Sequence, residues 1–258
     1  MREGALDLVT EEFAPVVDAA RTQISEVFGP TRLHSAYLYG SIPRGTAVPA
    51  RSDLDLLLAL RSAPTAADRA DADALETALD TSFTQVNGVG VVLCSTDTLL
   101  SELERYDLGW MLACLCTPLL GDDLAEQLPR YRPTSLLARE TNGDLGLALT
   151  RWRGLAANAA SDAQRRKLNR GVARRIVRTG LTLVMPRWNG WTSDLRESAE
   201  AFGRYYPERA AQMRLAAGVA VAPTADPAAL GMFLDELGPW LAAEYTAVHG
   251  EKAPRPGA

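Results

Sequence analysis

Two aspartates that follow a glycine–serine pair are the residues of this sequence best suited to chemistry. Gly40 and Ser41 end one apolar run, and Asp53 and Asp55 begin another. Side chains alternate between the two faces of a β-strand, so the two aspartates are predicted to share a face. Two carboxylates side by side repel each other unless a cation lies between them. Their oxygen atoms suit Mg²⁺, which usually completes its coordination shell with water and substrate phosphate.

The glycine–serine pair indicates what the ligand could be. Gly40 lets the backbone approach a ligand closely, and Ser41 can offer a hydroxyl and an amide to phosphate oxygens. Alone, an Asp-x-Asp is more often an exposed strand face, and a Gly-Ser is more often a turn. In this order, with each motif beside an apolar strand, the two together favour a phosphate and metal site.

The pattern hydrophobic-Gly-Ser, a short gap, then Asp-hydrophobic-Asp-hydrophobic resembles the polymerase-beta-like nucleotidyltransferase superfamily. The resemblance is specific over about residues 35–60. It implies that Gly40 and Ser41 grip a triphosphate. It also implies that Asp53 and Asp55 hold Mg²⁺ and form the catalytic pair.

A weaker likeness connects the chain to antibiotic adenylyltransferases of the streptomycin/spectinomycin type. Residues 117–122 resemble the segment that closes their catalytic domain, and the helical region that follows resembles their substrate domain. The likeness implies that an arginine of this region contacts the nucleotide phosphates. Arg178 is the best match, and Arg174 lies one helical turn before it. We also expect Arg44 and Ser52, beside the two motifs, to contribute to nucleotide binding.

The sequence departs from the superfamily at the third carboxylate, which active members usually carry on a later strand. The matching run, residues 86–94, contains no acid. Asp97 follows this run, but we expect it to cap the next helix. The general base is therefore unassigned. Asp97, Asp144 and Asp162 are the ordered candidates, although each is more readily explained as a cap or surface residue.

A second departure concerns the basic residues of the helical region. The likeness implies a lysine near Thr192, where there is none, and Arg187 is the available substitute. Arg170, Arg174 and Arg178 follow one another at intervals of four, which makes one helix face basic. This face is either a solvated surface paired with acids or an anion site.

The order of predicted elements gives the fold class. Apolar spacing predicts a helix over 6–28, and strands are predicted over 35–39, 54–60 and 86–94, with a helix over 66–83. Further helices are predicted over 99–119, 135–159, 165–184, 192–205, 207–221 and 228–249. The sequence therefore predicts an α+β protein. Residues 1–122 form an N-terminal α/β nucleotidyltransferase domain with a small mixed sheet, and residues 123–258 form a C-terminal all-helical bundle that closes on substrate and nucleotide.

Composition excludes several classes of protein. The 32 acidic and 27 basic residues give a net charge of −5, which argues against a general nucleic-acid-binding surface. Three cysteines do not suit a disulfide framework and indicate a reducing compartment. No apolar run reaches the roughly 18 residues of a membrane span, and the N-terminus lacks the plan of a signal peptide. A soluble cytoplasmic protein without a membrane partner is predicted.

Together, these features predict a Mg²⁺-dependent nucleotidyltransferase. It moves a nucleoside monophosphate, AMP from ATP, to a hydroxyl of a small molecule such as an aminoglycoside. Two alternatives stay open. The acceptor could be a protein or a tRNA, although the acidic net charge disfavours tRNA. The chain could instead be a nucleotide-binding protein that lost catalysis together with the third carboxylate.

Overall fold

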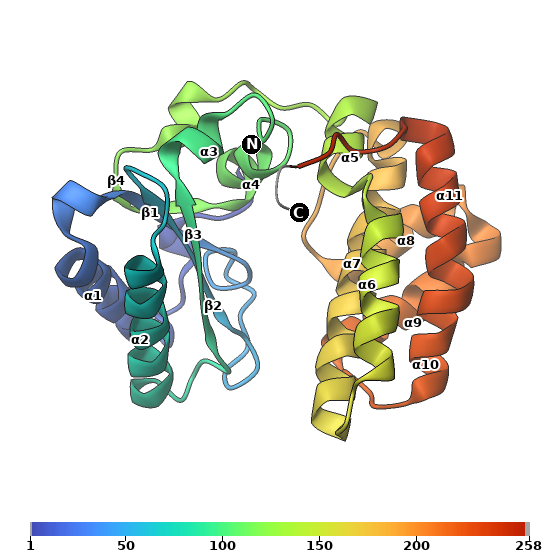
Figure 1. Ribbon diagram of the computed structural model, residues 1–258, viewed down its shortest axis with the longest axis horizontal. Helices are drawn as coiled ribbons and strands as arrows, with labels where there is room; N and C mark the ends of the chain where they lie inside the picture. Colours follow the sequence, from blue (N-terminus) through green and yellow to red (C-terminus); the bar gives the residue numbers. More distant parts are fainter. Residues whose placement is uncertain (1, 256–258) are drawn as a thin grey trace. The chain divides into compact units, whose positions relative to one another are not determined.

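The computed structural model describes residues 2–255 and contains two compact units, which divide between Tyr131 and Arg132. The first unit holds a four-stranded sheet with helices on both faces (Figure 1). The second unit is built from helices over its described residues, 132–255. The predicted α+β class, with a small mixed sheet before an all-helical region, is confirmed.

The sheet joins antiparallel and parallel strands. Its strands are β1 Leu33–Tyr39, β2 Leu54–Leu60, β3 Val89–Ser95 and β4 Thr117–Gly121. They lie in the order β3-β2-β1-β4, in which β1 is antiparallel to β2 and β4, and β2 is parallel to β3. Strand β2 has the predicted bounds, and β1 and β3 lie within three residues of their predicted ends.

The edge strand β4 corrects the prediction of one helix over 99–119. The structure has two short helices there, α3 Thr96–Leu100 and α4 Leu108–Leu115, and β4 begins directly afterwards. An apolar run of this kind suits a buried helix or a buried strand equally well. Pro118 has no N–H to donate, and it is tolerated because β4 lies at the edge of the sheet.

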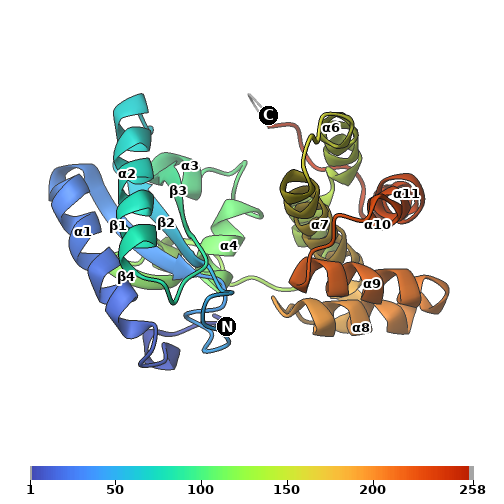
Figure 2. The ribbon, with the colours of Figure 1, turned by 90° about the horizontal axis from the view of Figure 1, so that it is seen from below.

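Both faces of the sheet are covered within the first unit. Helices α1 Ala14–Arg32 and α2 Ala66–Ser82 pack on one face (Figure 2). Leu54, Leu56 and Leu58 point toward them, whereas Leu57 points to the opposite face, which α3 and α4 cover. Burial on both sides explains the nearly continuous apolar sequence of β2. Asp55 is the exception, and it shares the face of Leu57.

The second unit packs around one long helix, α7, which contacts α5, α6, α8, α9, α10 and α11. The helices are α5 Ser135–Asn142, α6 Leu145–Ala157, α7 Asp162–Trp188, α8 Leu195–Tyr205, α9 Ala210–Val221, α10 Pro227–Gly231 and α11 Gly238–His249. A π-helical segment covers Met232–Leu237, and 3₁₀ helices cover Leu6–Leu8, Leu124–Gln127 and Pro207–Arg209. In the described part of the chain, no helix combines the length and apolar character needed to span a membrane.

Several predicted helix boundaries were wrong. The predicted helix over 6–28 is replaced by a short 3₁₀ helix over Leu6–Leu8 and by α1, which begins at Ala14. The predicted helix over 135–159 breaks at Gly143, where a Cβ would collide with the Arg139 carbonyl and with the backbone nitrogen of the distant Lys252. Asp97 does not cap α3: the Ser95 hydroxyl accepts the hydrogen bond from the N–H of Thr98, and Asp97 lies in the first turn.

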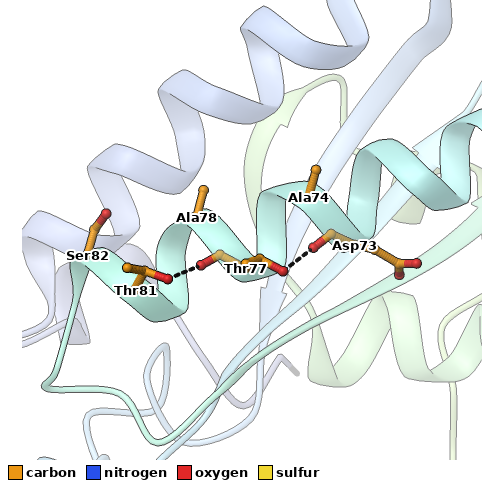
Figure 3. A pocket seen from close by; sticks show the side chains of 6 residues that line it. All are labelled: Asp73, Ala74, Thr77, Ala78, Thr81 and Ser82. Carbon is orange, nitrogen blue, oxygen red and sulfur yellow. Dashed lines mark hydrogen bonds between the residues drawn. The ribbon is translucent and has the colours of Figure 1, made fainter.

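A shallow depression on the outer side of α2 is formed by one helix (Figure 3). Its lining consists of Asp73, Ala74, Thr77, Ala78, Thr81 and Ser82. The hydroxyls of Thr77 and Thr81 donate to the carbonyls one turn earlier, each at 2.8 Å. These hydroxyls are therefore committed to their own helix, and we assign the depression no functional role.

An ion pair ties the ends of α1, β2 and α2 together. Arg32, at the end of α1, donates from Nε to Asp68 Oδ1 at 2.6 Å, and its NH2 donates to the carbonyl of Ala63 beyond β2. Asp68 also accepts a 2.6 Å hydrogen bond from the N–H of Thr65, whose hydroxyl accepts from the Asp68 N–H in a capping box. These donors, Arg32 first among them, hold the pKa of the Asp68 carboxyl well below its usual range.

We expect Asp68→Asn to lower the melting temperature of the protein by about 4 °C or more at neutral pH. Because folding lowers the pKa of Asp68, its stabilisation is complete above the unfolded-state value of about 3.9 and is lost as the pH falls further. The difference from the wild type should therefore shrink below about pH 4. Thermal unfolding across pH measures this, with the exposed Asp71→Asn as control. A difference that grows on acidification would contradict the assignment.

Candidate functional site

The register of the sheet places the predicted aspartates beside the predicted glycine. Tyr39, the last residue of β1, pairs with Asp55 of β2, and Gly40 follows directly. On the other side, Asp55 pairs with Gly90 of the parallel strand β3. Asp53 precedes β2 by one residue, two positions before Asp55, so alternation places both carboxylates on the same side.

Gly40 and Asp55 are in close contact. Gly40 has a φ of +83°, a left-handed conformation that favours glycine. A Cβ at this position would also collide with Oδ2 of Asp55. The left-handed conformation is the main reason for glycine at position 40, and a larger residue there would also displace the Asp55 carboxylate. The backbone turn that starts at Gly40 lies directly against one of the two carboxylates.

The turn after Gly40 is anchored in the core of the first unit. Gly45 N–H donates to the carbonyl of Ile42, and Thr46 N–H donates to that of Ser41, each at 3.1 Å. The side chain of Ile42 is 1% exposed and packs with the core formed by α1, α2 and the sheet. These contacts hold Ser41 at the start of a fixed turn beside Asp55.

Arg44 and Ser52 have contacts within the chain. Arg44 NH1 lies 3.6 Å from Oε2 of Glu3. The hydroxyl of Ser52 accepts a 2.9 Å hydrogen bond from the N–H of Val48, and the Ser52 N–H donates to the Val48 carbonyl at 2.9 Å. Both residues thus support the loops beside the aspartates. Their contact with a nucleotide stays a prediction.

The beginning of β3 and the residue before it leave space beside both carboxylates. A Cβ built on Gly88 would lie 3.7 Å from Oδ1 of Asp53, and one built on Gly90 would lie 3.9 Å from Oδ1 of Asp55. Both are ordinary van der Waals distances. The run in which a third acid was sought therefore borders the aspartates, with glycines at the two positions that face them.

Asn87 is a site residue that the sequence reasoning missed. Its Nδ2 donates a 3.0 Å hydrogen bond to Oδ1 of Asp53. The available signal was its position at the start of the run 86–94, which parallel pairing brings beside the segment that begins at Asp53. The superfamily pattern calls for an acid in that run, and an amide does not match it.

The pair of aspartates fits a Mg²⁺ ion. Among residues 2–255 there is no group of three or more histidine, cysteine, aspartate or glutamate side chains that could hold a metal ion. Asp53 and Asp55 offer hard oxygen donors beside glycines that leave space. Mg²⁺ commonly takes one or two protein carboxylates and completes its shell with water and substrate phosphates. The donor set matches that mode of binding.

Two of the candidate bases have basic partners in the second unit. Asp144 pairs with Arg175, and Lys252 Nζ lies 3.7 Å from its Oδ2. Asp162, in the first turn of α7, pairs with Arg165 at 2.8 Å, and the hydrogen bond from Arg165 lowers the pKa of the Asp162 carboxyl. A lower pKa makes a carboxylate a weaker base.

The arginines of the predicted basic face all lie on α7. Arg170 and Arg174 are half-buried, and Arg178 is exposed. Their spacing of four residues places them along one side of the helix. Their contribution to phosphate binding stays a prediction.

Cys114 and Cys116 are buried, as expected for small apolar residues. They are 4% and 0% exposed, and Cys116 packs in the core under α3 and α4. Burial raises the pKa of the Cys114 thiol to about 11, so this thiol is neutral at physiological pH. A neutral thiol is a poor metal ligand and a poor nucleophile.

A comparison with solved structures gives a match over most of the chain. Spectinomycin adenyltransferase AAD(9) from Enterococcus faecialis, in a crystal structure with ATP and spectinomycin, superposes with a TM-score of 0.54. The match covers 90% of this chain and 98% of that chain at 14% sequence identity. The two proteins share a fold. No family model matches the sequence, and no curated protein matches it either.

The shared fold confirms the resemblance to antibiotic adenylyltransferases that residues 117–122 and the helical region predicted. At this low identity it is evidence for the architecture alone. The assignment of the site therefore depends on the geometry of the residues around Asp53 and Asp55.

We expect Gly40→Ala to destabilise the protein by at least about 1 kcal/mol, because alanine in the left-handed region costs roughly that amount and its Cβ would displace Asp55. Chemical denaturation measures the change in the free energy of unfolding. Gly218→Ala is the control, since its helical position is exposed and open. Alanine there should be neutral or stabilise the helix by up to about 1 kcal/mol. Equal stabilities for the two variants would contradict the packing described for Gly40.

Proposed function

We propose that the chain is a Mg²⁺-dependent nucleotidyltransferase that moves AMP from ATP to a hydroxyl of a small molecule such as an aminoglycoside. The observation that supports this most directly is the contact between Gly40 and the Asp55 carboxylate. It brings a turn able to bind phosphate against a pair of potential metal ligands. The fold shared with an adenyltransferase solved with ATP and spectinomycin adds support.

The proposed chemistry needs positioning and charge neutralisation more than covalent help from the protein. Bound Mg²⁺ would neutralise phosphate charge and stabilise the charge that develops in transfer. Asp53 and Asp55 would hold the metal, and the backbone at Gly40 and Ser41 would orient the phosphates. The acceptor hydroxyl would attack the α-phosphorus in line, its proton would pass to a base or to water, and pyrophosphate would leave.

The remaining nucleotide contacts belong to the same proposal. Arg174 and Arg178 would donate charge-assisted hydrogen bonds to phosphate oxygens and so compensate part of the negative charge of the triphosphate. Ser52 would contribute to nucleotide binding indirectly, because its hydrogen bonds with Val48 hold the loop before Asp53. Arg44 lies close enough to Glu3 that a phosphate would compete with that carboxylate for its guanidinium.

Removal of both aspartates tests the proposal. We expect Asp53→Asn/Asp55→Asn to weaken Mg²⁺-dependent ATP binding at least about tenfold, because amides cannot neutralise the metal. Calorimetry with ATP, in the presence and absence of Mg²⁺, measures the affinity.

A matched control exists on α2. Asp71→Asn/Asp73→Asn removes two exposed aspartates with the same spacing and the same change in net charge. This control should bind like the wild type. Equal Mg²⁺-dependent affinity in the wild type and in the Asp53/Asp55 variant would rule out the proposed site.

Two glycines at the start of β3 and directly before it favour a second candidate, a nucleotide-binding protein without fast catalysis. Gly88 and Gly90 border the two carboxylates, and glycine offers neither a proton acceptor nor a metal ligand from a side chain. A general base typically contributes about 10²–10⁴ in rate. A protein of this kind would bind the nucleotide at the same site but would transfer AMP only slowly.

Restoring an acid separates the two candidates. Neither Gly88 nor Gly90 has a positive φ, and a Cβ at either position would make only ordinary van der Waals contact, so we expect Gly88→Glu and Gly90→Glu to fold. If the base is missing, at least one of them should raise turnover of ATP with acceptor by about tenfold or more. Turnover is measured as pyrophosphate release, with Gly218→Glu as control. Fast turnover in the wild type that neither variant improves would exclude the candidate that lacks a base.

A further inference from the structure

Asn87 is held beside Asp53 by the backbone as well as by its side chain. Its N–H donates to the carbonyl of Ser52 at 2.9 Å, and the N–H of Leu54 donates to the carbonyl of Gly88 at 2.8 Å. These two bonds continue the parallel pairing of β2 and β3 toward the loops. The backbone of Asn87 is therefore fixed relative to Asp53 before any side-chain contact is formed.

The side-chain amide of Asn87 does not need a hydrogen-bond partner within the protein. Asn87 is exposed, so water could satisfy its amide at no cost. Its Nδ2 nevertheless donates to Oδ1 of Asp53 at 3.0 Å. A solvent-exposed hydrogen bond of this kind contributes little to the free energy of folding, because water competes for both partners. Its main physical consequence is the orientation of the Asp53 carboxylate.

The charge of the group that donates to Asp53 affects how well this carboxylate can bind a cation. A lysine or arginine at position 87 would neutralise Asp53 and compete with a metal ion for it. The amide of Asn87 occupies one lone pair of Oδ1 and leaves the negative charge in place. Partners that hydrogen-bond to metal-ligating carboxylates fix the orientation of those ligands and are worth about 10–100-fold in metal affinity.

We propose that Asn87 is a positioning residue that orients Asp53 toward the Mg²⁺ bound with the nucleotide. This inference rests on the proposed function of the Asp53 and Asp55 pair. Ser52 supports the arrangement, because its carbonyl accepts from Asn87 while its hydroxyl accepts from Val48. The loop before β2, the start of β3 and the carboxylate are thereby joined.

Three variants test the role of the amide. Asn87→Leu keeps the approximate size of the side chain and removes the donor. Asn87→Gln keeps an amide donor on a longer side chain, which the exposed position accommodates. Thr84→Leu is the control, because it makes the same kind of polar-to-leucine change at an exposed position three residues earlier. Electron paramagnetic resonance with Mn²⁺ as a stand-in for Mg²⁺, with and without ATP, measures metal affinity in the full chain.

We expect Asn87→Leu to weaken Mn²⁺ binding in the presence of ATP by about 10–100-fold and Asn87→Gln to recover part of it. Melting temperatures of all three variants should stay close to the wild type, as is usual for surface positions. Wild-type affinity in Asn87→Leu would overturn this inference and leave the proposed function standing. Equal losses in Asn87→Leu and Asn87→Gln would also overturn it. Failure of the wild type to bind Mn²⁺ with ATP would overturn the proposed function and this inference together.

Discussion

Two carboxylates on the same side of the sheet, at the start of β2, are the constraint on which the rest of the site depends. Asp53 and Asp55 stand at the start of β2, whose other residues are buried on both faces. Both carboxylates are half-buried on the same side of the sheet, so a cation bound between them would relieve their mutual repulsion. Glycines at 40, 88 and 90 surround the pair. These glycines leave space beside the two carboxylates.

The rest of the first unit fixes this arrangement by register. Pairing of β1 with β2 sets Gly40 against Asp55, and pairing of β2 with β3 sets Gly90 against Asp55 and brings Gly88, just before β3, beside Asp53. A shift of β2 by one residue would turn both aspartates to the face of the sheet that α1 and α2 cover. The Arg32–Asp68 ion pair links the far ends of α1, β2 and α2. It helps to hold the same register from the opposite end of the sheet.

The sequence was sufficient for features whose signals are local. The bounds of β2, the glycine at position 40 and the shared face of the aspartates all follow from alternation and turn chemistry. Strand β4 could not be found this way, because its apolar residues suit a helix equally and only its pairing with β1 decides. The contact of Asn87 with Asp53 spans 34 positions and depends on the parallel register. The break at Gly143 likewise depends on atoms that approach only in the folded chain.

The most direct measurement is a crystal structure with Mn²⁺ and a non-hydrolysable ATP analogue, in which anomalous scattering locates the metal. We expect a metal ion coordinated by carboxylate oxygens of both Asp53 and Asp55 at about 2.0–2.3 Å. We also expect phosphate oxygens on the same ion and against the backbone of Gly40 and Ser41. A metal or triphosphate bound elsewhere on the protein, with both carboxylates in solvent, would contradict the central claim.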